Sequence, residues 1–158
     1  MGTLRFNAGS AASAANPSRL YFPLGTVKCQ GFLVFRSQAA RDLACLFDVD
    51  PGVRSWQAAP FELASGAGDH RPDFLVLYED GGRELADPCD RPLPDGVCLE
   101  DEAFGFGYSY RFYTISDIYH GHRLANAKDL LRYAGWNPGL DARVRLQAVL
   151  SEEGSLTV

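Results

Sequence analysis

Two aspartates in the stretch "HRPDFLVLYEDGGRELADPCD", residues 70–90, are spaced so that they can do chemistry together. Asp73 stands just before one short apolar run, and Asp87 stands at the end of the next. The "DGG" between the runs is a strong hairpin signal, so we expect both carboxylates at one end of two neighbouring strands. Such a pair repels unless a divalent cation lies between them, and Mg²⁺ or Mn²⁺ held there activates water for attack on a phosphate.

A helix is expected before this hairpin, from Ser37 to the Pro51-Gly52 pair. Ser37 is a suitable N-cap, and apolar residues then recur at helical spacing. Pro and Gly end the helix. The other elements of the first two thirds follow from apolar and β-branched runs bounded by Gly and Pro. They are strands over 31–36, 53–63 and 108–115, a turn over 65–70, a loop over 88–96 and a helical turn within 97–107.

Helices are expected to fill the C-terminal part of the chain. Ser116 and Asp117 are suitable caps, and residues 122–135 carry one apolar face before the stop at Gly135. Residues 140–153 form a last helix that is apolar on more than one side, so we expect it to pack on something. The order of elements predicts an α/β fold with a small mixed central β-sheet flanked by helices.

Composition limits the classes of function. The chain has 158 residues, a net charge of −5 and a pI near 5.1, the wrong sign for a protein that binds nucleic acid through its overall field. No apolar stretch is long enough to span a membrane and no signal peptide is visible, so we expect a cytoplasmic protein without a membrane partner. The four cysteines and three histidines make no zinc pattern, and we expect free thiols and no small-molecule cofactor.

Three longer stretches carry a family resemblance. They are "LFDVDPGV", "RPDFLVLY" and "HRLANAKDLLRY". Together they resemble the N-terminal domain of TnsA-type transposon endonucleases, members of the PD-(D/E)XK superfamily with a restriction-endonuclease-like core. The resemblance covers roughly residues 30–135 and implies a division into a flexible or arm-like segment 1–30, a nuclease-like domain 31–136 and a helical segment 137–158. The tail, residues 143–158, resembles the opening of the helical segment that follows in the family, and we expect the rest of that segment to be absent or cut off at Val158.

The resemblance implies that Asp73 and Asp87 are the catalytic, metal-binding pair, with Mg²⁺ or Mn²⁺ bound if the site is competent. Two groups of the family motif are missing, because Ala40 stands where the helix carries Glu and Cys89 stands where the strand ends in Lys. Arg36 occupies a further acidic position of the motif. Losing the cation that orients the water commonly lowers the rate about 10²–10⁴-fold.

No nearby acid is expected to replace the missing groups. Glu84 points to the opposite face of its strand from Asp87, Asp80 falls in the turn, and Asp90 falls in the loop. Simultaneous losses at separate positions therefore indicate a vestigial site. The metal ligands Asp73 and Asp87 are predicted as remnants of catalysis.

Basic residues near these motifs are candidates for DNA contact, namely Arg71, Arg123, Lys128 and Arg132. We therefore predict a catalytically impaired, nuclease-like domain that acts by binding a protein partner, or DNA within a complex. Two alternatives stay open. One is an active divalent-metal-dependent DNA endonuclease, and the other is a small regulator that sequesters a protein such as a transcription factor. An exposed apolar patch on residues 136–158, if the structure has one, would favour the regulator.

Overall fold

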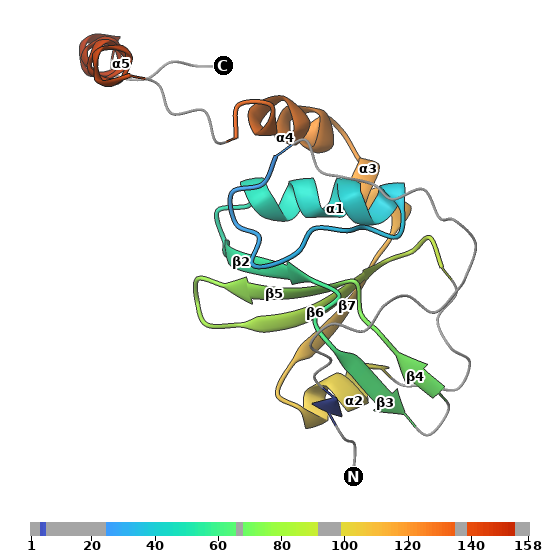
Figure 1. Ribbon diagram of the computed structural model, residues 1–158. Coiled ribbons are helices and arrows are strands. Elements are labelled where there is room, and N and C mark those ends of the chain that lie inside the picture. Colours follow the sequence, from blue (N-terminus) through green and yellow to red (C-terminus); the bar gives the residue numbers. More distant parts are fainter. Residues whose placement is uncertain (1–3, 6–24, 66–67, 92–98, 135–138, 154–158) are drawn as a thin grey trace.

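The computed structural model describes residues 4–5, 25–65, 68–91, 99–134 and 139–153. A four-stranded sheet lies at the centre, with helices stacked on one face and a second, smaller sheet on the other (Figure 1). This arrangement confirms the predicted α/β class with a small mixed sheet flanked by helices. Within the described residues, no helix combines the length and apolar character needed to cross a membrane.

The central sheet has the order β2-β5-β6-β7, from strands β2 (Val53–Ala58), β5 (Phe74–Tyr78), β6 (Arg83–Pro88) and β7 (Ser109–Tyr113). The pairs β2–β5 and β5–β6 are antiparallel, whereas β6 and β7 are parallel. The β5–β6 hairpin is the one predicted from the "DGG" turn. Residues 28–30 add a short parallel stretch beside β2, through hydrogen bonds to the backbone of Trp56.

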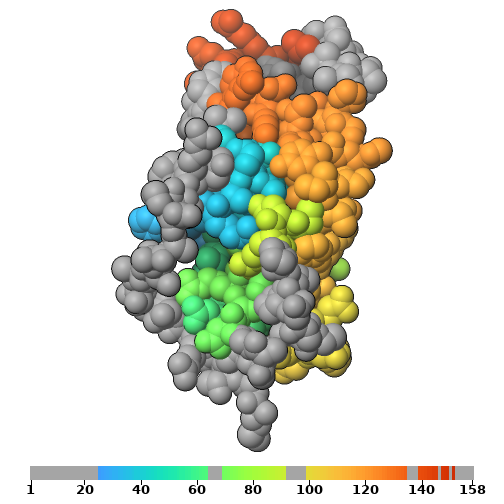
Figure 2. Space-filling view, turned by 90° about the vertical axis from the view of Figure 1, so that its right-hand side faces the viewer, coloured from blue at the N-terminus to red at the C-terminus, as the bar shows by residue number. Residues whose placement is uncertain are grey.

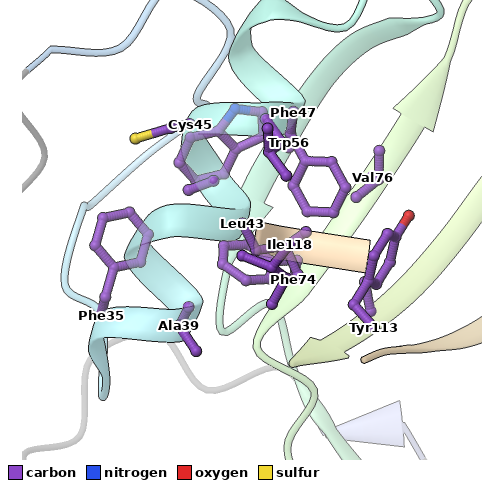
Figure 3. Packing of buried hydrophobic residues seen from close by; sticks show 14 of the residues in the cluster. Phe35, Ala39, Leu43, Cys45, Phe47, Trp56, Phe74, Val76, Tyr113 and Ile118 are labelled. Carbon is purple, nitrogen blue, oxygen red and sulfur yellow. The ribbon is translucent and has the colours of Figure 1, made fainter. Parts of the chain in front are cut away.

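Helix α1 (Gln38–Val49) covers one face of this sheet. Its N-cap is Ser37, whose hydroxyl accepts a hydrogen bond from the Ala40 backbone N–H, as the sequence predicts. The helix packs on a cluster of aromatic side chains from the strands (Figure 3). Phe74 lies at the centre of this cluster, with its ring centroid 5.4 Å from that of Phe47 and 5.7 Å from that of Trp56.

Helices α3 (Ile115–Tyr119) and α4 (Arg123–Leu131) follow β7 and pack on α1 (Figure 1). The cap of α3 is Thr114 and not Ser116, because Thr114 and Asp117 form a complete capping box. Helix α5 (Leu140–Glu153) stands apart from the rest in Figure 1. Its described side chains are exposed, so the packing expected for this helix is not seen.

The opposite face of the sheet is covered by a second layer. It consists of β1 (Leu4–Arg5), β3 (Glu62–Ser65) and β4 (Gly68–His70) as a small antiparallel sheet, together with α2 (Leu99–Gly105). These elements enclose a core of five buried residues: Phe61, Leu63, Leu85, Leu99 and Ala103.

The strand boundaries correct three sequence predictions. Residues 53–63 are not one strand, because the chain breaks at Ala59, which has a φ of 44°, and at Pro60. The predicted turn over 65–70 is instead the region where β4 pairs with β3. Residues 31–36 form no regular strand, although Phe35 is buried in the α1 core.

Candidate functional site

Asp73 and Asp87 meet at one end of the β5–β6 hairpin. Phe74 pairs with Ala86 in the register, which places the two aspartates side by side, and the backbone N–H of Asp73 donates to Oδ1 of Asp87 at 2.9 Å. Figure 2 views the molecule from the side where the residues that directly follow β6 (yellow-green) lie between α1 (cyan) and the α3–α4 region (orange). The hairpin therefore brings the two predicted carboxylates together.

Asp87 is completely buried, and both of its oxygens are engaged. Oδ2 accepts from the Tyr110 hydroxyl and lies against Nε2 of His70, each at 2.7 Å. Oδ1 accepts from Nη2 of Arg91 at 2.7 Å, besides the backbone N–H of Asp73. Burial alone raises the pKa of this carboxyl, but the hydrogen bond from His70, the charge of Arg91 and the hydrogen bond from Tyr110 outweigh it and hold the pKa below its usual range. Asp87 is thus a buried anion with four donors.

Asp73 is held by Arg36, which precedes α1. The Arg36 Nε lies 2.9 and 2.8 Å from the two carboxylate oxygens, and its Nη2 lies 2.6 Å from Oδ2. The same Nη2 lies 2.7 Å from Oδ1 of Asp90, so one guanidinium bridges two carboxylates. Burial and the nearby Asp87 carboxylate raise the pKa of Asp73 against the opposing effect of Arg36. Arg36 is therefore a cation that is fixed between the carboxylates of Asp73 and Asp90.

A divalent metal does not fit these donors as they are arranged. Mg²⁺ and Mn²⁺ need carboxylate lone pairs that are free to point at the ion. In this cluster those lone pairs accept hydrogen bonds from Arg36, Arg91, His70 and Tyr110. Across the described residues, no group of three or more His, Cys, Asp or Glu side chains is arranged to hold a metal ion. The arginines supply the positive charge that a metal supplies in a nuclease.

The two positions at which the sequence departs from the motif it resembles lie close to this cluster. Ala40 is 1% exposed, and with Arg36 and Asp73 it lines a small pocket of about 170 Å³. Cys89 is half-buried, and its backbone N–H continues the β6–β7 ladder by donating to the Tyr113 carbonyl at 2.9 Å. A methyl group and a thiol thus stand where the motif has a carboxylate and an ammonium group.

Glu84 does not join the cluster, in agreement with the strand alternation. Its Oε1 accepts hydrogen bonds from the hydroxyls of Tyr78 at 3.0 Å and Tyr113 at 2.8 Å, and Tyr113 belongs to the α1 core. Asp87 faces the other way, towards His70 on β4. The acids of β6 are therefore divided between the two faces of the sheet.

The candidate DNA-contact residues do not form one stripe. Arg71 lies in the β4–β5 connection and is paired with Glu62, whereas Arg123, Lys128 and Arg132 lie on or just after α4. Of these four cations, only Arg123 is in no ion pair within the described part of the chain.

The other two cations near α4 are paired in different ways. Lys128 places its Nζ 2.7 Å from Oδ1 of Asp42, whose side chain is 3% exposed, so this pair joins α4 to α1. Arg132 pairs with Asp129 at 3.4 Å, and both side chains are about two-thirds exposed. Lys128 therefore holds two helices together, and the Arg132 pair contributes little.

Sequence reasoning missed the partners of the two aspartates. His70 and Tyr110 carry no motif, and only the folded sheet brings them to Asp87. The pairing of Arg36 could have been predicted. A basic residue that stands where the motif has an acid can form an ion pair with the remaining acid, Asp73.

Neither protein-family models, nor curated proteins, nor solved structures match this chain. What the cluster can do therefore follows from its own geometry. It joins the start of α1, the β5–β6 hairpin and β4 through ion pairs and hydrogen bonds. Such a network of ion pairs and hydrogen bonds favours a structural role over a metal centre.

Proposed function

We propose that this chain is a nuclease-like domain of the TnsA type that has lost catalysis and acts by binding a protein partner, with DNA contacted only within the complex. The observation that carries the proposal is the pairing of Arg36 with Asp73 and of Arg91 with Asp87. Each carboxylate that the resemblance assigns to the metal is neutralised by a guanidinium group instead.

The chemistry of the guanidinium group argues against hydrolysis. Metal-dependent cleavage needs a polarising cation, an activated water and a group that accepts its proton. Arginine stays protonated in proteins, and the pKa of Arg36 is raised further, because its hydrogen bonds and ion pairs with Asp73 and Asp90 outweigh the opposing effect of burial. Arg36 therefore neutralises charge but cannot accept a proton.

The distribution of charge argues against DNA binding by this chain alone. The net charge is −5, and three of the four candidate DNA contacts are already paired with acids of the same chain. Non-specific DNA affinity grows with the number of phosphates neutralised by free Lys and Arg side chains. We therefore expect at most weak DNA binding at physiological salt.

Exposed apolar side chains support a binding role and also favour the second candidate, a regulator that sequesters a protein. On α5, Leu140 is 75% exposed, Val144 55% and Val149 42%. Phe32, six residues before α1 in the sequence, is 93% exposed. Leu140 and Val144 are four residues apart on α5 and so share one helix face, and exposed apolar side chains that lie together in this way mark protein-interaction surfaces.

Plasmid nicking by the purified chain, with Mg²⁺ and then with Mn²⁺, tests the proposal. We expect no more cleavage from the wild type than from the Asp73→Ala variant. Robust cleavage that Asp73→Ala abolishes would overturn the proposal in favour of an active endonuclease. Fluorescence anisotropy with a labelled duplex, at low and at physiological salt, measures in parallel whether the chain binds DNA without a partner.

A further inference from the structure

A second hollow lies on the α1 face of the sheet, away from the carboxylate cluster. The cluster gathers at the start of α1 and β5, whereas this pocket is lined by the C-terminal half of α1, by Tyr78 at the end of β5, and by the α3–α4 region. Its volume is about 450 Å³, which falls within the usual range of small-molecule sites. Apart from Arg123, a candidate DNA contact, no residue that lines this pocket has a part in the proposed function.

The base of the pocket is fixed by packing. Leu43, Leu46 and Phe47 of α1 line it and are buried in the core. The hydroxyls of Tyr78 and Tyr113 both donate to Glu84, which holds the two rings in place. The pocket therefore exists before any ligand arrives, and a ligand does not have to order its walls.

Cationic and neutral donors line one wall. The Arg111 guanidinium lies over the Tyr113 ring, 4.4 Å from the ring centroid. This contact orients the guanidinium plane and leaves the N–H groups at its edge free to bind a ligand. Its only ion pair among the described residues, with Asp117, is long at 3.8 Å, and both side chains are partly exposed. Arg123 and His120 line the same pocket and are in no ion pair within the described chain. Such a set of donors suits a phosphate group.

Two carboxylates, Asp50 and Asp117, balance these cations. The pKa of Asp117 is lowered by hydrogen bonds from the Thr114 hydroxyl and backbone N–H, so this acid stays ionised. Asp50 accepts a hydrogen bond from the Gly52 backbone N–H through Oδ1. An anion without other polar groups gains little binding energy where the charges that line the pocket cancel. A ligand that also carries hydroxyl groups can donate hydrogen bonds to the two carboxylates.

From this combination we infer that the pocket binds a phosphorylated sugar, either free or as part of a nucleotide. The phosphate lies between Arg111 and Arg123, with Ser116 and His120 within the same lining. The sugar hydroxyls face Asp50 and Asp117. The room beside Tyr78 and Tyr113 accommodates the body of the ligand. This inference does not depend on the carboxylate cluster, so the outcome of the nicking assay leaves it unaffected.

Isothermal titration calorimetry of the full chain tests the inference with ribose 5-phosphate, ribose, inorganic phosphate and a nucleoside 5′-monophosphate. We expect ribose 5-phosphate to bind at least about tenfold more tightly than ribose or inorganic phosphate. Arg111→Gln and Arg123→Gln should each weaken that binding about tenfold or more, since each removes charge-assisted hydrogen bonds. Arg54→Gln, an exposed arginine on β2 outside the pocket, is the matched control and should bind as the wild type does.

Tighter binding of the nucleoside monophosphate than of ribose 5-phosphate supports a nucleotide, and equal binding supports a free sugar phosphate. Ribose 5-phosphate that binds no better than its two parts would overturn the inference. Unchanged affinity in both arginine variants, with circular dichroism showing that they are folded, would overturn it as well.

Discussion

Replacing Asp87 with Asn distinguishes a structural ion network from a metal site that lacks its cation. In a metal site, two adjacent carboxylates without an ion repel each other, and removing one relieves that repulsion. Here Asp87 accepts from His70, Tyr110, Arg91 and the Asp73 backbone. Removing its charge should therefore destabilise the fold, so the sign of the change in unfolding free energy carries the answer.

The magnitude follows from burial. The Asp87 side chain is 0% exposed, His70 is 4% exposed and Arg91 is 28% exposed. Asn keeps the shape and one acceptor oxygen, but it loses the charge and turns the other oxygen into a donor. Removing one partner of a buried ion pair costs about 3–5 kcal/mol. Water can reach part of the Arg91 side chain, so we expect a loss of about 2–4 kcal/mol.

Urea unfolding at neutral pH, followed by far-UV circular dichroism, measures this loss as a lower transition midpoint at an unchanged slope. Asp129→Asn is the matched control, because Asp129 is also an ion-paired aspartate but its side chain is 67% exposed. We expect the control to change the unfolding free energy by less than about 0.5 kcal/mol. An Asp87→Asn variant as stable as the wild type, or more stable, would refute the reasoning.

Three further predictions follow from the same contacts. Arg36→Gln should raise Mn²⁺ affinity at least about tenfold, because charge-assisted hydrogen bonds of about 1.5–3 kcal/mol no longer compete for the carboxylates. Electron paramagnetic resonance of free Mn²⁺ measures the affinity, and equal affinity in wild type and variant contradicts the prediction. The pKa of Asp87 is lower in the folded than in the unfolded chain. The stability difference between wild type and Asp87→Asn should therefore be complete above about pH 4 and shrink as the pH falls through the pKa of Asp87 in the folded chain. Urea titrations at several pH values measure this difference, and a difference that grows on acidification contradicts the prediction. Lys128→Met should cost about 2–3 kcal/mol because the buried Asp42 loses its cation and keeps only the hydrogen bond from Gln38, whereas Arg132→Met should cost less than about 1 kcal/mol. Calorimetric unfolding measures both losses, and equal losses would show that burial does not determine the strength of these ion pairs.

Local signals predicted the elements that carry the site. Ser37 and the Pro51-Gly52 pair bracket α1 as expected, and the "DGG" turn predicts the β5–β6 hairpin. The hairpin in turn brings Asp73 and Asp87 together. These features depend on hydrogen bonds between residues close in sequence, which is why sequence patterns report them.

Features that depend on distant partners escaped prediction. Residues 53–63 alternate as one strand, yet β3 leaves the central sheet after Ala59 and Pro60 and pairs with β4 and β1 instead. The burial of Asp87 depends likewise on β4 and β7, which deliver His70 and Tyr110. No local pattern encodes such contacts, because they form only when strands far apart in the sequence come together.

Direct measurement of Mn²⁺ binding by the wild-type chain tests the central claim, that arginines and not a metal neutralise the carboxylate cluster. Titration into the protein at low salt, followed by electron paramagnetic resonance, reports any loss of free Mn²⁺. We predict no stoichiometric binding at micromolar concentrations, and a signal that Asp73→Ala leaves unchanged. One Mn²⁺ bound per chain, and lost in Asp73→Ala, would contradict the claim.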